Sequence, residues 1–259
     1  MAVVLEGGCR VSTMHEGVPQ VSGSLKLWNQ VGRSNGADAI SLRILEFGPG
    51  ASPALRNREC DEVLYLLEDL DDENAPAGCT VSIDGSSYEV GPRTGIYLRP
   101  GETLRVENPG PRAVTFVSSQ CPEEGFTTTA EPSPDHAVSP QMSPMVRLSD
   151  RRPLPTADRW YRVLVDDEIG SEQVTQFVGS IPPGRAPDHF HEYEEVLFIL
   201  RGEGRMWAGE TSTRIGPGSC IYLPRKQIHC VENIGTGELR LLGLFYPAGS
   251  PAVRYESAD

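Results

Sequence analysis

Three side chains able to bind a metal ion lie close together in the sequence, at His189, His191 and Glu195. Side chains in a β-strand alternate between its two faces with a period of two, so these three odd-numbered residues would share a face. A second segment contains His229, which two strands around a turn could bring to the same cavity. Imidazole nitrogens with a carboxylate suit a first-row divalent metal ion. The sequence therefore predicts one metal ion per chain, bound by His189, His191, Glu195 and His229.

The alternative interpretation is that these histidines are ordinary core or surface residues. For a single histidine that would be the better choice, but four possible ligands at compatible positions favour a metal site. The adjacent carboxylates Asp188 and Glu194 have the opposite parity. We therefore expect Asp188 and Glu194 to point away from the cavity.

The spacing around these ligands resembles the two sequence motifs of the cupin family. The positions that define the resemblance are His189, His191, Glu195 and Gly202 for the first motif, and Gly218, Pro224, His229 and Asn233 for the second. The resemblance implies a small jelly-roll barrel in which the three histidines and the glutamate bind Fe, Mn, Ni, Zn or another divalent ion. One departure is Lys226, where the second motif usually has glycine, and it affects a turn rather than a ligand.

Length and composition indicate a globular protein with one large or two small domains. The chain has 259 residues, of which 38% are hydrophobic and 23% are charged, and domains usually contain about 150 residues. Its net charge of −13 argues against nucleic acids and anionic membranes as partners, because both require a basic surface. We expect a small-molecule substrate and a monomer or homodimer.

The first residues, the lack of a long apolar stretch and the cysteines predict a cytoplasmic protein. The first residues lack a basic region followed by an apolar run of signal-peptide length. No apolar stretch approaches the roughly 18 residues of a transmembrane helix. The six cysteines form no Cys-x-x-Cys pair, so reduced thiols are expected.

Short β-like segments separated by turn residues dominate the chain from residue 40 onward. Turns are marked by pairs such as Asp84–Gly85 and Pro100–Gly101, and helical periodicity is absent. Two stretches lie 125 residues apart and repeat each other, Val90–Leu98 and Ile215–Leu223. The pattern predicts an all-β protein with two tandem cupin-type jelly-roll barrels. The expected domains are an N-terminal arm (1–39), a first barrel (40–117), a proline-rich linker (118–158) and a second barrel with its tail (159–259).

The first copy of the repeat lacks the metal ligands. The register places Arg56, Arg58, Glu62 and Leu104 where the second copy has His189, His191, Glu195 and His229. A guanidinium group stays protonated and cannot bind a metal ion, so the first barrel is expected to be metal-free. The arginines either pair with Glu62 as an internal ion cluster, which we favour, or bind a carboxylate or phosphate at the barrel mouth.

The ligand set permits several chemistries at the second barrel. We expect a metal-dependent enzyme, in first place an Fe(II)-type dioxygenase acting on a small organic acid, phenol or diol. A redox-neutral hydrolase, isomerase or lyase is the second alternative, and a non-enzymatic protein that binds a sugar-like small molecule is the third. Gln176, Arg205 and Tyr222 are candidates for polar contacts to a substrate, because their strands neighbour the motifs.

Overall fold

The computed structural model describes residues 1–57, 59–68, 78–125, 127–129 and 143–252. Within these ranges the regular structure consists of β-strands and four short 3-10 helices, without an α-helix. The predicted all-β fold with two jelly-roll barrels is confirmed. No helix in the described part of the chain has the length and apolarity needed to cross a membrane.

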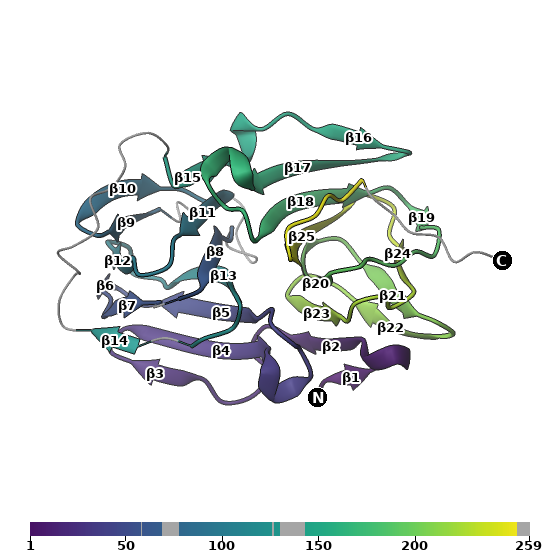
Figure 1. The fold of residues 1–259 in the computed structure, drawn as a ribbon, viewed down its shortest axis with the longest axis horizontal. Helices are drawn as coiled ribbons and strands as arrows, with labels where there is room; N and C mark the ends of the chain where they lie inside the picture. Colours follow the sequence, from purple (N-terminus) through teal and green to yellow (C-terminus); the bar gives the residue numbers. More distant parts are fainter. Residues whose placement is uncertain (58, 69–77, 126, 130–142, 253–259) are drawn as a thin grey trace.

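The first barrel consists of two facing sheets, shown in Figure 1 from purple to teal. The larger sheet contains, in order, β15 (Met145–Arg147), β11 (Thr94–Leu98), β8 (Asp61–Leu66), β13 (Val114–Cys121), β5 (Leu42–Phe47), β4 (Leu25–Val31) and β3 (Gln20–Ser22). The smaller sheet contains β10 (Ser86–Val90), β9 (Cys79–Ile83), β12 (Thr103–Asn108), β7 (Ala54–Arg56) and β14 (Thr127–Thr129), with β6 (Gly50–Ala51) paired to β12. The 3-10 helices η2 (Arg33–Asn35) and η3 (Leu148–Asp150) lie in connections.

The second barrel repeats this plan and lies beside the first (Figure 1). Its larger sheet contains, in order, β1 (Val3–Val4), β2 (Arg10–Thr13), β23 (Ser219–Leu223), β20 (Glu194–Arg201), β25 (Leu239–Tyr246), β18 (Thr175–Ile181), β17 (Arg159–Val165) and β16 (Leu154–Thr156). The smaller sheet contains β19 (Gly184–Arg185), β24 (His229–Asn233), β21 (Gly204–Ala208) and β22 (Thr211–Ile215). Two further 3-10 helices are η1 (Glu6–Gly8) and η4 (Asp167–Ile169).

The central strands of both large sheets are buried on both faces. On β20, Leu197 and Ile199 pack inside the second barrel, whereas Val196 and Phe198 pack in a core that the two barrels share. This explains why the strand is an almost continuous apolar run rather than an alternating one. Because side chains of successive residues face opposite ways, each central strand serves its own barrel and the contact between barrels.

Each half of the chain also contributes strands to the other barrel, β1 and β2 in one direction and β15 in the other. Strand β2, near the N-terminus, pairs with β23 of the second barrel, with Val11 opposite Ile221. Strand β15 precedes the second barrel in sequence but pairs with β11 of the first. The range expected as an N-terminal arm, 1–39, thus contributes β1 and β2 to one barrel and β3 and β4 to the other.

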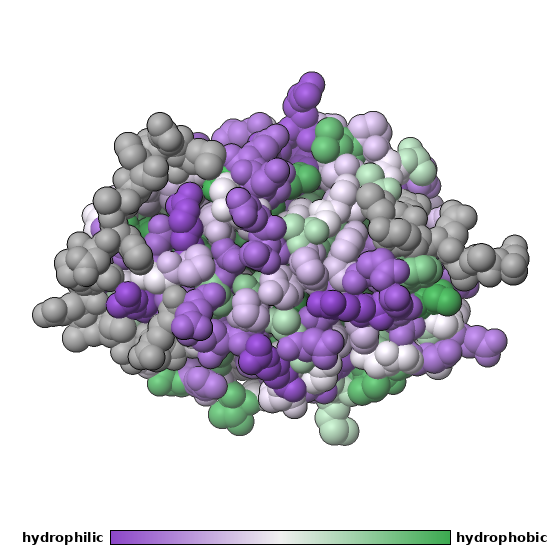
Figure 2. Space-filling view, in the orientation of Figure 1, coloured by the Kyte–Doolittle hydropathy of each residue, from purple (hydrophilic) through white to green (hydrophobic). Residues whose placement is uncertain are grey.

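The visible surface is mainly hydrophilic, and its hydrophobic residues form small separate groups (Figure 2). Among the described residues, the most exposed large hydrophobic side chains besides Met1 include Val18 and Val21, near β3. Scattered apolar residues of this kind are normal on a protein surface and carry no functional meaning by themselves.

Candidate metal centre

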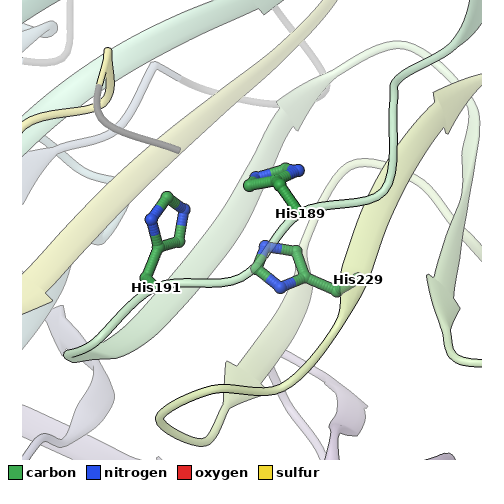
Figure 3. Close-up of side chains that lie close together, drawn as sticks. All are labelled: His189, His191 and His229. Atoms are coloured by element: carbon green, nitrogen blue, oxygen red, sulfur yellow. The ribbon is translucent and has the colours of Figure 1, made fainter. Parts of the chain in front are cut away.

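Three imidazoles converge inside the second barrel, from His189, His191 and His229 (Figure 3). One ring nitrogen from each lies within 4.8 Å of the others. His229 begins β24, and His189 bonds to it through both backbone groups, at 3.0 and 2.9 Å. His191 lies just before β20, and its carbonyl accepts the N–H of Lys226 at 2.7 Å. Backbone bonds between two distant segments therefore bring the three rings together.

Two of the rings have a fixed tautomer. The Nδ1 atom of His189 lies 3.1 Å from the carbonyl oxygen of Pro187, and that of His229 lies 2.8 Å from the carbonyl oxygen of Gln227. A carbonyl oxygen only accepts hydrogen bonds, so each Nδ1 carries the proton. Nε2 of each ring therefore keeps its lone pair for a ligand, which is the arrangement that metal-binding histidines use.

The carboxylate of Glu195 completes the cluster. Its Oε2 atom lies 3.4 Å from Nε2 of His229 and 3.7 Å from Nε2 of His191. The side chain is buried, and no hydrogen bond reaches Oε2 within the described part of the chain. A carboxylate oxygen and imidazole lone pairs that face one another are stabilised by a cation between them. The donor set therefore fits a divalent metal ion.

The electrostatics of the cluster keep the ligands in their metal-binding forms. Burial, together with the nearby His229, lowers the pKa of His189 to about 3, so this ring is neutral at physiological pH. Burial acts to raise the pKa of Glu195, but the surrounding imidazoles outweigh it and hold that pKa below its ordinary value. A neutral imidazole and an ionised carboxylate are the forms that bind metals.

The cluster lies in a cavity of about 90 Å³. Apolar side chains supply much of its wall, including Phe177, Leu197, Val231, Leu241 and Phe245. Besides the metal-site residues, the lining of the cavity includes one charged side chain, that of Arg159 on β17. This side chain is 10% exposed, and its Nε lies 3.4 Å from the carboxylate of Asp158. The site thus combines metal ligands, an apolar wall and one cation.

Aromatic rings hold His191 in place. The imidazole stacks on the ring of Tyr193, with centroids 4.9 Å apart and an interplanar angle of 11°. Phe245 lies 5.3 Å from the same imidazole, and the Tyr193 hydroxyl donates to the carbonyl oxygen of Ser250 at 3.1 Å. Packing on two sides restricts the rotation of this ring.

Lys226, which stands where the second motif usually has glycine, lies in the turn before His229. This residue adopts a left-handed backbone with φ of 62°, which glycine would adopt without strain. Its side chain lies at the surface, 3.3 Å from Glu192. The substitution therefore changes the turn and not the ligand positions.

The three residues expected to contact a substrate do not line the cavity. Gln176 donates to the carbonyl oxygen of Leu64 in the first barrel at 3.3 Å, and Tyr222 donates to Glu194 at 2.7 Å. Arg205 donates to Ser212 at 3.2 Å on the smaller sheet. Phe177, Gly179, Ser180 and Ile181 of β18 line the cavity instead, whereas Gln176 faces the first barrel.

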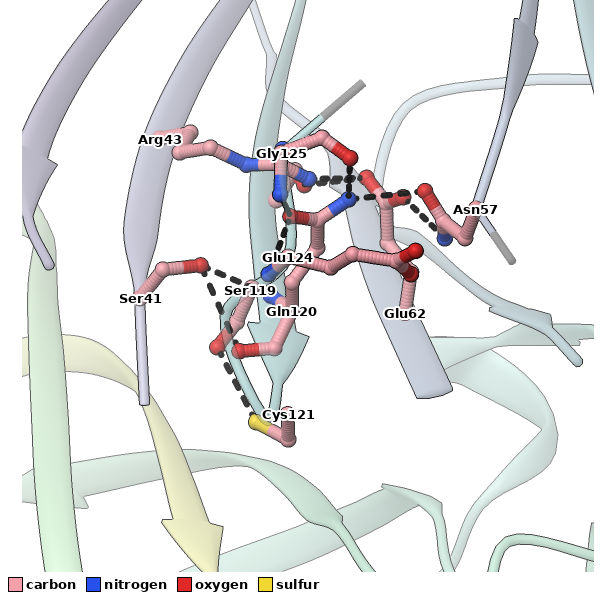
Figure 4. A network of polar contacts seen from close by, with 10 residues as sticks. Ser41, Arg43, Asn57, Glu62, Ser119, Gln120, Cys121, Glu124 and Gly125 are labelled. Carbon is pink, nitrogen blue, oxygen red and sulfur yellow. Dashed lines mark hydrogen bonds and ion pairs between the residues drawn. The ribbon is translucent and has the colours of Figure 1, made fainter. Parts of the chain in front are cut away.

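In the first barrel a buried hydrogen-bond network surrounds the glutamate that corresponds to Glu195 (Figure 4). Arg43 donates to Glu62 Oε1 at 2.6 Å, Ser118 donates to the same oxygen, and Asn57 donates to Oε2 at 2.6 Å. Gln120 in turn donates to Asn57 at 2.7 Å. Glu62 is 0% exposed, and this network compensates its charge.

The counter-ion of Glu62 is thus Arg43 and not Arg56, with which the sequence had suggested a pair. Arg56 donates instead to the carbonyl oxygen of Gly101 at 3.1 Å, and Leu104 packs in the first barrel's core. Arg58 lies outside the described residues. The register explains the difference, because Arg43 lies on β5 opposite Ser118, which also binds Glu62, whereas Arg56 is the last residue of the short strand β7 in the smaller sheet.

Matched positions show how the two interiors diverged. Arg43 is opposite Ser118 on neighbouring strands of the first barrel, and Phe177 is opposite Gly243 at the corresponding positions of the second. A Cβ atom on Gly243 would lie 2.2 Å from the Phe177 ring. The phenyl ring therefore requires glycine opposite it, whereas Arg43 is opposite a serine that also binds Glu62.

Sequence analysis did not identify two charged residues of these interiors, Arg43 and Arg159. A charged residue inside the apolar run Leu42–Phe47 could have indicated an internal ion pair. Nothing local distinguishes Arg159, because its place at the cavity depends on the pairing of β17 with β18.

Comparisons with known proteins agree with this architecture. Residues 177–245 match the family model described as the cupin domain. An uncharacterized protein of Methanocaldococcus jannaschii is 39% identical over 54 residues, which are 21% of this chain and 43% of the relative. The match thus spans less than half of that relative's length.

Solved structures of oxalate decarboxylase from Bacillus subtilis share the fold over most of the chain. A single-substitution variant of that enzyme superposes with a TM-score of 0.72 at 14% identity and covers 93% of this chain and 78% of its own. A structure concerned with the Mn(II) centres of the enzyme gives a TM-score of 0.71 at 15% identity, with coverage of 93% and 78%. The C-terminal barrel thus matches the cupin domain, and the chain as a whole has the two-barrel fold of a bicupin, with the three-histidine group in its C-terminal barrel.

Proposed function

We propose that the C-terminal barrel is the active site of an enzyme that uses one divalent metal ion to act on a small organic acid. The observation that carries the proposal is the convergence of three imidazoles and the buried Glu195 Oε2 on one point of the cavity in the second barrel. His189, His191, Glu195 and His229 would hold the ion. When bound, such an ion supplies Lewis-acid or redox chemistry to a substrate that occupies its open positions.

The residues around the ligands support an organic acid as substrate. Arg159 supplies a guanidinium group to the cavity, and guanidinium binds carboxylates with two parallel hydrogen bonds. Phe177 and Phe245 add apolar surface to the same cavity, and an apolar wall that excludes water strengthens electrostatic contacts inside. The volume of about 90 Å³ favours a molecule of only a few heavy atoms.

An Fe(II)-type dioxygenase is the reaction class we place first, because three histidines and one glutamate leave positions for both a substrate and dioxygen. A redox-neutral lyase that releases carbon dioxide from an acid is the second candidate. The shared fold with oxalate decarboxylase, an enzyme with Mn(II) centres, supports this second class.

Metal analysis is the first test. Protein purified without added metal, then loaded separately with Fe(II) or Mn(II), is expected to retain one ion per chain after dialysis. Glu195→Gln should lower metal affinity by at least tenfold, because it removes the anionic ligand. Glu62→Gln, the matched change in the first barrel, should leave metal content unchanged. Two ions per chain, or equal loss in both variants, contradicts the assignment.

Activity assays then separate the two reaction classes. Small mono- and dicarboxylic acids are supplied to each metal form while dioxygen consumption and carbon dioxide release are followed. Dioxygen consumed in proportion to substrate supports the dioxygenase. Carbon dioxide released without net dioxygen consumption supports the lyase, and binding without turnover in any metal form overturns the enzymatic proposal.

A further inference from the structure

A carboxylate next to the metal site binds the first barrel instead of the metal. Glu194, at the start of β20, is 0% exposed. Its Oε1 accepts the backbone N–H of Asp38 at 2.8 Å, and its Oε2 accepts those of Ala39 at 2.9 Å and Ile40 at 3.2 Å. The hydroxyl of Tyr222 donates to Oε1 at 2.7 Å. One side chain of the second barrel thus receives four hydrogen bonds, three of them from the first.

Glu194 and Glu195 are adjacent on β20, so their side chains leave opposite faces of the strand. Glu195 points into the metal cavity and Glu194 points into the contact between the barrels. Fixing one carboxylate therefore limits the rotation of the backbone at the start of β20. That rotation determines where the other carboxylate points.

The donors of these bonds belong to a well-anchored loop. The carbonyl oxygen of Ala39 accepts the N–H of Glu123 at 2.6 Å, and the N–H of Ser41 bonds to Gln120 at 3.2 Å. The side chain of Arg33 donates to the carbonyl oxygen of Asp38 at 3.2 Å. The first barrel therefore presents three N–H groups in a fixed arrangement, which is what orienting a carboxylate requires.

The corresponding position of the first barrel lacks this arrangement. Asp61 precedes Glu62 as Glu194 precedes Glu195, and the Tyr97 hydroxyl donates to Asp61 at 2.5 Å as Tyr222 does to Glu194. Among the hydrogen bonds of the described residues, Asp61 has no counterpart to the three backbone donors from the other barrel. The aspartate is one methylene shorter than glutamate. Of these two positions, the four-bond arrangement is therefore seen, within the described residues, beside the barrel that has the histidines.

We propose that Glu194 is a positioning residue through which the first barrel sets the geometry of the metal site in the second. The inference rests on the proposed metal site but not on the reaction performed there. It gives the first barrel a role although its own ligand positions are replaced. Partners that orient metal ligands indirectly typically contribute 10- to 100-fold to metal affinity, and we expect an effect of that size here.

The test compares metal affinity in matched variants of the full chain. Glu194→Gln keeps the size of the side chain but replaces one acceptor oxygen with a donor that faces backbone N–H groups. Tyr222→Phe removes one bond and leaves the carboxylate intact. Asp61→Asn and Tyr97→Phe are the same changes in the first barrel. Metal dissociation constants are measured by competition with a chelator well below the melting temperature, and Mn(II)-loaded protein is examined by electron paramagnetic resonance.

Glu194→Gln is expected to weaken metal binding at least tenfold and to alter the Mn(II) spectrum, with a smaller change in the same direction for Tyr222→Phe. Asp61→Asn and Tyr97→Phe should stay within twofold of the wild type. If Glu194→Gln does not fold, Tyr222→Phe and Tyr97→Phe provide the same comparison. Unchanged affinity in the second-barrel variants, or equal losses in both barrels, overturns the inference. A wild-type protein that binds no divalent ion refutes the proposed metal site instead.

Discussion

Glu62 and Glu195 occupy corresponding positions in the two barrels but have opposite surroundings. Glu62 is surrounded by donors, among them Arg43 and Ser118, whereas Glu195 faces imidazole lone pairs. The first arrangement is complete within the protein, and the second requires a cation. Donor placement around a glutamate at matched positions thus distinguishes the barrel that could hold a metal ion from the one that could not.

Breaking the buried pair should strongly destabilise the protein. Arg43→Met leaves the charge of Glu62 buried without its counter-ion, and such changes typically cost about 3–5 kcal/mol. Adding Glu62→Met removes the remaining charge and should restore much of the lost stability, because two apolar side chains can fill the same space. Urea unfolding of the single and double variants measures both effects. If the single variant lost less than about 1 kcal/mol, the pair would not be the compensated buried charge described above.

Asp61 is expected to make stability depend on pH. Burial raises the pKa of its carboxyl, and the hydrogen bond from Tyr97 only partly opposes that effect. The folded state then binds the proton more tightly than the unfolded chain does. Stability from this group is therefore largest below the ordinary pKa of about 4 and is lost as pH rises through the raised value.

Asp61→Asn should remove this decline while keeping an acceptor for Tyr97. The difference in unfolding free energy between variant and wild type is expected to move in favour of the variant as pH rises from 4 to 7. Denaturant unfolding at several pH values measures it. A difference that is constant with pH contradicts the raised pKa.

At the scale of the ligands, the sequence was informative because parity and spacing are local properties. His189, His191 and Glu195 could be grouped without knowing the fold, although both histidines precede the strand β20 that contains Glu195, and His189 forms an isolated bridge with His229. Arg43, Arg159 and the role of Glu194 could not be identified in this way. Their partners come from strands or loops far away in the sequence, and only the tertiary pairing brings them together.

Among the elements, β18 and β25 show how packing shapes the cavity. Phe177 lies across from Gly243, and no side chain on Gly243 could coexist with the present position of the ring. Gly179 lies on the same strand as Phe177, but a Cβ there would meet its nearest neighbour at 3.4 Å, an ordinary contact. A larger residue would therefore clash with the phenyl ring at Gly243 but fit at Gly179.

Gly243→Ala should push the Phe177 ring toward the metal cavity. We expect a loss of about 1–3 kcal/mol in unfolding free energy, as is typical of overpacking in a core. Gly179→Ala serves as the control and should cost less. Thermal and urea unfolding compare the two, and thermal shift with the metal ion reports on the cavity. Equal stability of both variants would contradict the close packing of the ring.

The repeat made the strands themselves predictable. Val90–Leu98 and Ile215–Leu223 indicated two copies of one fold, and turn residues indicated where strands end. The pairing of β2 with the second barrel and of β15 with the first could not be predicted. Short edge strands have weak patterns of their own, and their partners are selected by which sheet edge lies within reach.

On the scale of the whole molecule, the two barrels are joined by more than a connecting chain. One core cluster contains Tyr65 and Val117 from the first barrel together with Phe198 and Leu242 from the second. Strands β2 and β15 each extend a large sheet of the other half. Removing either barrel would therefore expose the shared core and a sheet edge of the remaining barrel. This predicts that neither barrel is stable alone.

Both barrels are accordingly expected to unfold in a single transition. Trp28 is the only tryptophan of the first barrel and lies in the shared core, whereas Trp160 and Trp207 belong to the second. A variant with Trp160→Phe and Trp207→Phe therefore reports through Trp28 on the first barrel and its contact with the second, and Trp28→Phe reports on the second barrel. Urea unfolding is followed in each variant by fluorescence and by circular dichroism. The fluorescence midpoint should equal the circular dichroism midpoint of the same variant in both cases.

A metal ion provides the sharper form of this experiment, because the proposed metal site lies in only one of the two barrels. Ligand that binds the folded state raises stability in proportion to the logarithm of its concentration over the dissociation constant. If the barrels unfold together, metal added to the second barrel must also raise the midpoint reported by Trp28 in the first. A midpoint for Trp28 that ignores the metal, while the second-barrel reporters shift, would show that the shared core does not couple the barrels.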